Sequence, residues 1–353
     1  MSGLLIVLTV VLVLVVVIQI SKASEYVSIL KGKEKTREQT NKVNATLMIL
    51  FLIFGLIGVY ICNEVLKDKL LPEAASIQGR AIDTMIWWTL ILTGIVFLGT
   101  QIMLFYFAFK FRGRPGKVGK YVPDNDKLEL TWTSITAGVL LILIIFGLRE
   151  WFIITAPGPK DAMVVEVTGK QFNWMFRYPG RDGVLGSKDY KLIDAAKSNP
   201  LGQNWNDKSN DDDIVSNGEM HLVVNKPVRL IINSQDVIHD VGMPNFRMKM
   251  DAVPGIPTTL WFTPTITTKE MAKKTGDPDF VYELACDQLC GNGHYSMRAT
   301  IIVQTQAEFD KWAASQTPQY KIAMGSDTPA ASDSTQTTGN LPHADSTKSV
   351  AVR

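Results

Sequence analysis

Two cysteines, one histidine and one methionine fall within the twelve residues from Cys286 to Met297. The segment reads CDQLCGNGHYSM and spaces these side chains as C-x3-C-x3-H-x2-M. Thiolate and thioether are soft metal ligands and imidazole suits copper, so this set favours copper over magnesium or calcium. A blue-copper site needs only one cysteine. The simplest use of a second cysteine four residues away is to bridge a second copper.

A second imidazole has to come from outside this segment. The chain has four histidines, one of which, His343, lies in a polar C-terminal stretch. His239 lies in NSQDVIHDVGMP, shortly after a strand-like run from Pro227 to Ile232. A loop that follows such a strand could bring His239 to the two cysteines, so we take it as the second imidazole.

Three simpler interpretations of these residues stay open at this stage. Cys286 and Cys290 could form a disulfide, which suits a domain outside the cytoplasm. They could bind structural zinc, although such sites usually pair their cysteines as C-x2-C and have no use for Met297. Met297 by itself could fill the hydrophobic core, as methionine often does.

CDQLCGNGHYSM together with SQDVIHDVGMP resembles subunit II of the heme-copper oxidases that carry the binuclear CuA centre. MKMDAVPG, which follows closely, matches the K-x-D-A-x-P-G turn of that family, and the resemblance covers about residues 85–313. It implies that Cys286 and Cys290 bridge two coppers. The other ligands it implies are the terminal His239 and His294, the weak axial Met297 and the backbone carbonyl of Gln288.

The aromatic segment before the copper ligands departs from the family pattern. GKQFNWMFRY, from Gly169 to Tyr178, resembles a segment beneath the copper site that usually reads H-Q-W-x-W-x-Y. Phe172 stands where the family has its first tryptophan, and only Trp174 keeps the indole. We therefore expect the contact with the electron donor to shift towards Trp174 or the acidic residues near Asp211. The simpler interpretation of these aromatic residues is core packing.

Polar positions near the copper segment also need two interpretations. At the position of Gln288, many family members have a glutamate. The carboxylate of that glutamate helps to hold a magnesium ion at the subunit I interface. The neutral amide leaves that magnesium an open question. Asp236 matches a position that helps to dock cytochrome c, or it is an exposed acid in a turn. Lys249 and Asp251 match a polar pair that faces subunit I, or they form a simple surface ion pair.

The composition of the chain predicts a membrane part and one globular domain. The chain has 353 residues, 46% of them apolar, and its net charge of +2 gives no reason to expect nucleic-acid binding. Four apolar runs of at least 18 residues precede residue 155, close to the ~20 residues that cross the hydrocarbon core. The transmembrane helices that we predict are at about residues 3–20, 45–62, 85–109 and 130–150.

The loops between these helices predict their orientation. Basic residues are concentrated at 21–44 and 110–127 and are fewer at 63–84. The positive-inside rule then places the first and third loops in the cytoplasm and the C-terminal domain on the periplasmic side of a bacterial inner membrane. A signal peptide is the alternative for the first run, but that run lacks a basic start and a clear A-x-A site.

The family pattern has two helices, which match the third and fourth predicted here. The first two helices are therefore additional, and we expect them to pack against another subunit or against membrane lipid. Glu129 begins the fourth helix, where Asp126 and Glu129 have the spacing of a capping box. The E-x-x-W-T pattern there also resembles the carboxylate near the cytoplasmic mouth of a proton path into subunit I.

From about residue 160 the pattern changes to short β-branched runs separated by glycine, proline and asparagine. These runs predict an all-β Greek-key sandwich or barrel, and the resemblance implies a cupredoxin-like fold. The predicted strands are 163–167, 220–224, 228–232, 258–262, 280–284 and 298–303. The predicted parts of the chain are a membrane region at 1–155, a periplasmic copper domain at 156–314 with a polar insertion at 179–218, and a disordered tail at 315–353.

Within the predicted insertion, Asp211, Asp212 and Asp213 follow one another. They form either a solvated loop or a docking surface for a basic cytochrome.

The resemblance implies subunit II of a bacterial respiratory heme-copper cytochrome c oxidase, a proton-translocating oxidoreductase. The chain would accept electrons from a c-type cytochrome, which a supercomplex could tether, and pass them to heme in subunit I for reduction of oxygen to water. A copper-delivery protein needs neither His239 nor four helices, and a quinol-oxidase subunit II typically lacks the copper ligands. The sequence contains no C-x-x-C-H motif for covalent heme.

Overall fold

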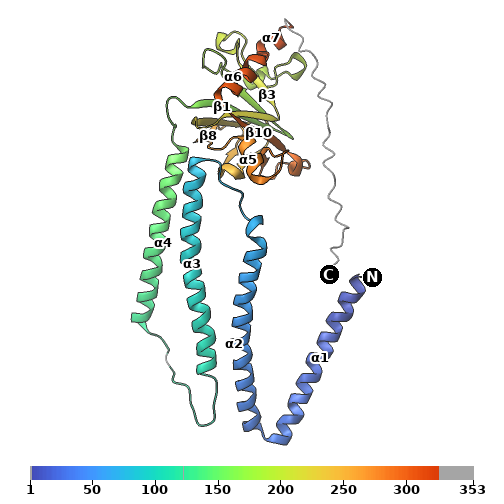
Figure 1. Cartoon of the computed structure of the whole chain (residues 1–353), viewed down its shortest axis with the longest axis vertical. Coiled ribbons are helices and arrows are strands. Elements are labelled where there is room, and N and C mark those ends of the chain that lie inside the picture. The colour runs from blue at the N-terminus through green and yellow to red at the C-terminus, as the bar shows by residue number, and fades with distance from the viewer. Residues whose placement is uncertain (1, 122, 326–353) are drawn as a thin grey trace. The chain divides into compact units, whose positions relative to one another are not determined.

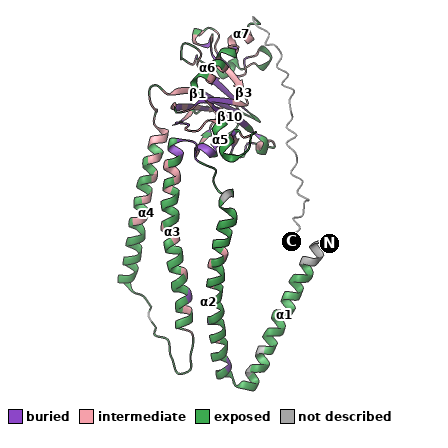
Figure 2. Cartoon of the chain, viewed as in Figure 1, coloured by how far each residue is buried: buried purple, intermediate pink, exposed green. Residues whose placement is uncertain are grey.

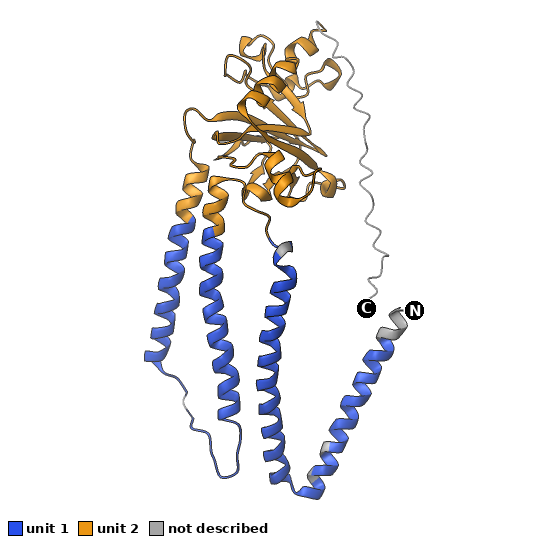
Figure 3. Cartoon of the chain, viewed as in Figure 1, with its two compact units in different colours: residues 1–70, 84–147 blue, residues 71–83, 148–353 orange. Residues whose placement is uncertain are grey.

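The computed structural model describes residues 2–121 and 123–325, which divide into two compact units (Figures 1 and 3). The first unit comprises residues 1–70 and 84–147, and the second comprises residues 71–83 and 148–353. The first unit consists mainly of four long helices. These are α1 (Ser2–Lys31), α2 (Lys33–Leu66), α3 (Ile77–Lys110) and α4 (Asp126–Thr155).

Four helices in the described part of the chain are long and apolar enough to cross a membrane, which confirms the predicted number. Each extends beyond its predicted apolar run, because the flanking lysine, glutamate, glutamine and arginine residues are also good helix formers. Most of the helix surface is exposed (Figure 2). Exposed apolar faces of this extent are suited to contact with lipid or with other subunits.

A single residue, Gly32, separates α1 from α2. Gly32 has a φ of 86°, a conformation that residues with a side chain rarely adopt. The Thr36 hydroxyl donates a hydrogen bond to the Gly32 carbonyl at 3.0 Å and stabilises the start of α2. The predicted loop at 21–44 is therefore helical on both sides of a sharp turn.

The start of α4 differs from the predicted capping box. Asn125, which precedes the first helical residue, accepts a hydrogen bond from the Leu128 amide at 3.1 Å through its side-chain oxygen. Asp126 is the first residue of the helix, so its side chain is one position too late to cap. Glu129 is exposed, and its position in the first turn still complements the helix dipole.

The second unit contains two five-stranded sheets, which confirms the predicted β-sandwich of cupredoxin-like type. Strands β1 and β5 pair in parallel, as do β4 and β10, and the other pairings are antiparallel. One sheet has the order β3 (Ile214–Asn217), β2 (Asn173–Tyr178), β1 (Met163–Lys170), β5 (Val228–Ser234) and β8 (Thr258–Phe262). The other has the order β4 (Glu219–Val223), β10 (Arg298–Gln304), β9 (Tyr282–Cys286), β6 (His239–Met243) and β7 (Met248–Ala252).

The six predicted strands correspond to β1, β4, β5, β8, β9 and β10, with β9 two residues later than expected. The prediction did not include β2, β3, β6 and β7. All five residues of β6 are buried, and five of the six in β2 are buried. A strand covered on both faces has no alternation of apolar and polar residues, so the period that identifies a strand is missing.

Aromatic side chains fill much of the space between the sheets. Phe246 packs against Phe262 and Tyr282, with ring centroids 5.1 and 4.8 Å apart. Such pairs contribute roughly 0.5–1.5 kcal/mol each beyond the area that they bury. The same buried cluster includes Cys286, Cys290 and Met297, so the hydrophobic core itself positions three of the predicted copper ligands.

Residues 71–83 belong to the second unit although they precede its strands by about 80 residues. The Ala75 amide donates to the Asn245 carbonyl at 2.7 Å, and the Ser76 hydroxyl donates to the Phe246 carbonyl at 2.8 Å. Arg247 pairs with Asp83 at 2.8 Å. The segment before α3 is thus part of the β domain, outside the boundaries of 156–314 that the sequence predicts.

The insertion at 179–218 is ordered by buried charges, and its acidic run is not uniformly solvated. Asp211 is exposed, whereas Asp213 is fully buried and lies 3.3 Å from the Arg177 guanidinium. Asp212 accepts hydrogen bonds from two backbone amides of the insertion. Of the three acids only Asp211 is left free to meet a partner, because packing between sheet and insertion uses the other two.

The remaining α-helices belong to the second unit, with α5 between β8 and β9 in the chain and α6 and α7 after β10. They are α5 (Thr268–Thr275), α6 (Gln306–Ser315) and α7 (Gln319–Ala323). Helices α5 and α6 each begin with a capping box, formed by Thr267 with Glu270 and by Thr305 with Glu308. Helix α7 lies within the predicted tail, and residues 326–353 of that tail are outside the described residues.

Candidate metal centre

The predicted ligands come from β6, from the end of β9 and from the loop that follows β9. His239 is the first residue of β6 and Cys286 is the last residue of β9. These strands are neighbours, with Val241 opposite Cys286. The loop closes on itself, because the Cys286 amide donates to the Met297 carbonyl at 3.0 Å. Sheet pairing therefore unites residues that are 47 positions apart in the sequence.

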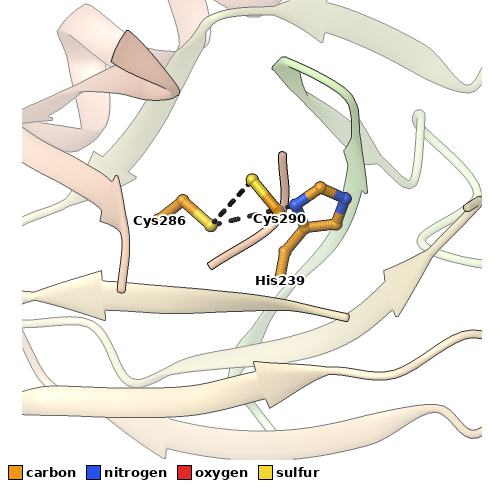
Figure 4. Close-up of side chains that lie close together, drawn as sticks. All are labelled: His239, Cys286 and Cys290. Atoms are coloured by element: carbon orange, nitrogen blue, oxygen red, sulfur yellow. Dashed lines mark hydrogen bonds between the residues drawn. The ribbon is translucent and has the colours of Figure 1, made fainter. Parts of the chain in front are cut away.

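The sulfur and nitrogen atoms of these side chains converge on one small volume. The Sγ atoms of Cys286 and Cys290 are 3.7 Å apart (Figure 4). The Nδ1 atom of His239 lies 3.8 Å from the Cys286 sulfur, and the Nδ1 atom of His294 lies 3.6 Å from the Cys290 sulfur. Each cysteine thus faces one imidazole, in the arrangement expected for two bridging thiolates between two terminal histidines.

Two weaker donors complete the set. The Met297 Sδ atom lies 3.8 Å from the Cys290 sulfur, and the Gln288 carbonyl oxygen lies 3.1 Å from the Cys286 sulfur. The Gln288 side chain is exposed, so the backbone rather than the amide faces the sulfurs. The structure thus brings together all six predicted ligands, whereas Glu129 belongs to the other unit.

The spacing of the donors fits metal ions placed between them. Donor atoms roughly 2.0–2.3 Å from one tetrahedral ion are roughly 3.3–3.8 Å from one another. The separations of 3.6–3.8 Å between sulfur and nitrogen or between two sulfurs fall in this range. A disulfide has an S–S length of roughly 2.0 Å, and Cys286 and Cys290 are both free. The disulfide interpretation is therefore wrong for this structure.

Burial sets the protonation state of the Cys290 thiol before a metal binds. It raises the pKa of the Cys290 thiol to about 11, with a further contribution from the neighbouring Cys286. A free thiol in this position is neutral near pH 7, and it must lose its proton to become a ligand. Two thiolates this close are stable only with a positive charge between them, which favours a metal over an empty pair.

A second layer of residues orients the ligands, and the sequence did not identify it. Asp236 accepts a hydrogen bond from the His239 Nε2 atom at 2.8 Å, which leaves Nδ1 directed at the cysteines. Burial raises the pKa of Asp236, but hydrogen bonds from the Gln171 amide and from His239 outweigh it and lower the pKa overall. Gln171 also donates from its side chain to the Cys290 carbonyl. Asp236 is thus more than an exposed turn acid, since metal-bound imidazoles commonly have such a carboxylate partner.

The two aromatic residues expected to handle electrons have different surroundings. Phe172 is 40% exposed, and its ring lies so close to the loop that a Cβ atom at Gly293 would clash with it and one at Gly291 would be in tight contact with it. Trp174 is fully buried, with its ring edge-on to His239 at 5.8 Å between centroids. A buried indole cannot touch a donor protein, so direct contact of the donor with Trp174 is excluded in this conformation.

Lys249 pairs with Asp287 at 3.3 Å rather than with Asp251. Gly242 lies opposite Lys249 in the sheet, and a side chain there would collide with Asp287. The absence of that side chain lets the loop at residues 287–297, called the copper loop below, approach β6 and bring Asp287 to the lysine.

Comparison with known proteins identifies the family. Residues 163–305 match the profile of the cytochrome c oxidase subunit II periplasmic domain. The alternative cytochrome c oxidase subunit 2 of Bradyrhizobium diazoefficiens is 38% identical over 238 residues, which cover 67% of this chain and 80% of that protein. The chain belongs to the cytochrome c oxidase subunit II family.

Further relatives of this subunit II are more distant. The cytochrome c oxidase subunit 2 of Thermostichus vulcanus is 30% identical over 269 residues, covering 69% of this chain and 77% of that protein. The periplasmic domain of subunit II of the Bradyrhizobium japonicum cytochrome oxidase is 24% identical, with a TM-score of 0.31 over 44% of this chain and 94% of the other. That score is too low to carry an argument, so the fold rests on the strand order above.

Proposed function

We propose that this subunit II accepts single electrons from a c-type cytochrome at a binuclear copper centre. The electrons would pass on to heme in subunit I, where oxygen is reduced to water. The observation that carries this proposal is the convergence of two thiols, two imidazole Nδ1 atoms, a thioether and a backbone carbonyl on one site. Zinc has no use for the thioether, and a mononuclear copper site leaves one thiolate over.

The protein's part in this reaction is positioning and electrostatics. A bound pair of coppers would supply the one-electron chemistry. Cys286 and Cys290 would share the change in charge between two metals, and the strands that hold His239 and Cys286 limit movement of the ligands. Asp236 fixes the orientation of the His239 ring through its hydrogen bond. A site that is rigid in both oxidation states favours fast transfer.

The metal content of the purified full-length chain tests the proposal. We expect two coppers per chain and an electron-spin spectrum in which one unpaired electron is shared equally by both copper nuclei. A spectrum of a single mononuclear copper, or a preparation that binds only zinc when both metals are offered, would contradict it. The copper content and the spectrum together distinguish a binuclear centre from two unrelated copper ions.

The surface over the copper loop is the proposed contact for the donor. Phe172 covers the loop, and the side chains of Leu289 and Tyr295 on the loop are 77% and 81% exposed. Leu289 and Tyr295 each adjoin a proposed ligand in the sequence, so with Phe172 they offer exposed apolar atoms that suit a donor whose redox group is also surrounded by apolar atoms. Trp174 would act behind this surface, next to His239, rather than in contact with the donor.

The remaining roles concern the assembled oxidase. We propose that the β domain faces the periplasm of a bacterial inner membrane and that Lys249 and Asp251 lie towards subunit I. Glu129, exposed at the start of α4, would stand near the cytoplasmic mouth of a proton path into subunit I. Gln288 offers no carboxylate, so an interface magnesium would need its acidic ligands from elsewhere.

A further inference from the structure

A pocket in the helical unit lies outside everything that the copper centre uses. It has a volume of about 240 Å³ and is formed by the start of α2 and the turn after α3. The Asn41 side chain donates to the Gly113 carbonyl at 3.2 Å and holds that turn against α2. Its lining residues are Glu34, Arg37, Glu38, Asn41, Gly113, Arg114, Pro115, Gly116 and Lys117.

The pocket contains charges of both signs that do not pair with each other. Arg37, Arg114 and Lys117 provide three cationic side chains. Glu34 and Glu38, one helical turn apart, provide two carboxylates. Within the described residues, none of these five side chains takes part in a hydrogen bond or an ion pair with another side chain. Both signs of charge are therefore available to a ligand that is itself a zwitterion.

The inner edge of the pocket reaches the depth of lipid headgroups, and its charged residues on α2 extend further out, seven to eleven residues before Ala45. Asn41 is four residues before Ala45, where the apolar run of α2 begins, which corresponds to about 6 Å along a helix. The headgroup layer on each side of the hydrocarbon core is roughly 5–7 Å thick. On the other wall, Gly113 lies three residues after Lys110, the last residue of α3. Basic pockets between membrane helices bind lipid headgroups through their phosphates.

We propose that this pocket binds the phosphoethanolamine headgroup of an aminophospholipid. Arg37, Arg114 and Lys117 would hold the phosphate, because guanidinium and ammonium groups donate several hydrogen bonds to phosphate oxygens. Glu34 and Glu38 would accept hydrogen bonds from the primary ammonium group. A volume of about 240 Å³ corresponds to roughly eight water molecules, which is adequate for a headgroup of about eight non-hydrogen atoms.

Charge complementarity favours this headgroup over the two common alternatives. Phosphatidylglycerol has the phosphate but no cation, so Glu34 and Glu38 would remain uncompensated beside it. Phosphatidylcholine has a quaternary ammonium without N–H groups, so the two carboxylates would lose their hydrogen bonds. A free phosphate or phosphoethanolamine lacks the acyl chains that the exposed apolar faces of α2 and α3 could contact.

Native mass spectrometry of the delipidated full-length chain, titrated in detergent with each lipid in turn, tests the headgroup site. We expect phosphatidylethanolamine to bind at least about fivefold more tightly than phosphatidylcholine or phosphatidylglycerol. Arg114→Ala should weaken phosphatidylethanolamine binding about fivefold, since one basic residue at a membrane surface contributes roughly 1 kcal/mol. Glu38→Gln should abolish the preference over phosphatidylcholine while leaving phosphatidylglycerol binding unchanged or stronger.

Lys120→Ala is the matched control, because Lys120 is an exposed base of the same turn that does not line the pocket. It should change lipid binding by less than twofold, and far-ultraviolet circular dichroism should show equal helix content in all variants. Equal loss in Lys120→Ala and Arg114→Ala would overturn the proposal. So would a Glu38→Gln chain that keeps its headgroup preference, or a wild-type chain that binds soluble phosphoethanolamine as tightly as the lipid.

Discussion

At the scale of single residues, hydrogen bonds from residues outside the ligand set position the ligands of the candidate copper centre. Asp236 bonds to both the His239 ring and the Gln171 amide, and Gln171 bonds to the Cys290 carbonyl. One ligand on β6 and one on the copper loop are thus connected through two residues that touch no metal. Changes in either should alter metal binding by moving a ligand, and outer partners of this kind commonly affect metal affinity by 10–100-fold.

Substitution of a bridging cysteine and substitution of the axial methionine should have different effects on copper binding. Cys290→Ser removes a proposed bridge and should leave at most one copper per chain. Met297→Leu keeps the volume of a buried side chain and removes only a weak ligand, so both coppers should stay and the reduction potential should change. Metal analysis with redox titration measures both. Cys62→Ser, at an exposed cysteine of α2, is the control and should bind two coppers; two coppers in Cys290→Ser would refute the bridge.

Electron acceptance should depend on the exposed ring more than on the buried indole. Phe172→Ala removes the side chain that covers Gly291 and Gly293, and we expect the rate of reduction by a c-type cytochrome to fall about tenfold or more. Phe172→Trp should keep the rate, because an aromatic contact is restored. Compared with Phe172→Ala, Trp174→Phe should slow electron transfer less and destabilise the hydrophobic core more. Stopped-flow reduction measures these rates, and a normal rate in Phe172→Ala would show that the donor binds elsewhere.

The sequence alone could group most of the proposed metal ligands, because residue types and spacing indicate their chemistry. The copper loop is local, so Cys286, Cys290, His294 and Met297 could be grouped from the sequence. The roles of Gln171 and Asp236 could not, because Gln171 comes from the turn before β2 and meets the loop only in the folded domain. Asp236 had one signal, its spacing of three residues from His239. The burial of Trp174 could not be predicted from the sequence either, since aromatic residues occur both in cores and on binding surfaces.

At the scale of elements, one of the two strands that carry the site, β6, is among those that the sequence did not identify. β6 holds His239 and is buried on both faces, so it lacks the alternation that revealed β5 and β10. Its central position between β9 and β7 brings His239 to the cysteines. The insertion at 179–218 was predicted as a polar loop because its sequence is polar, but buried ion pairs fix it to the sheet.

The insertion should make stability depend on pH through Asp213. Burial raises the pKa of Asp213 to about 7, although Arg177 and the Gly186 amide oppose this. The unfolded chain loses that proton near pH 4, so between about pH 4 and 7 the folded chain holds more protons, and stability falls as pH rises. Asp213→Asn should flatten this part of the profile of thermal unfolding midpoint against pH. Asp211→Asn, at the exposed neighbour, should leave the slope unchanged, and equal slopes in all three proteins would contradict the assignment.

At the scale of the whole molecule, the chain combines a membrane region and a β domain in one sequence. Residues 71–83 lead from α2 into the β domain before α3 begins, and Trp261 donates to the Ile153 carbonyl at 2.7 Å near the end of α4. The ends of α3 and α4 are thus attached to the sandwich by hydrogen bonds, whereas α1 and α2 belong wholly to the helical unit. This difference agrees with α3 and α4 as the helices that the family pattern includes.

The orientation of the whole chain can be tested at its first helix. The run from residue 3 to 20 contains fifteen leucine, isoleucine and valine residues. At roughly −0.3 to −0.6 kcal/mol each, these favour insertion by about 4–9 kcal/mol, whereas one central arginine costs ~2.5–3.5 kcal/mol. Val13→Arg alone should therefore leave most chains inserted. The double variant Val10→Arg with Val13→Arg should prevent most insertion. The control, a double variant with leucine at both positions, should insert normally.

Reporter fusions at the turn between α1 and α2 and after residue 155 measure the outcome. In the wild-type chain, the fusion at Gly32 should report cytoplasm and the fusion after 155 should report periplasm, because basic residues are concentrated in the first and third loops. The double arginine variant should fail to insert α1 while α3 and α4 keep their orientation, since their own loop carries the basic residues at 110–127. A periplasmic signal at Gly32 in the wild type would reverse the topology. The copper domain would then face the cytoplasm, away from a periplasmic cytochrome donor.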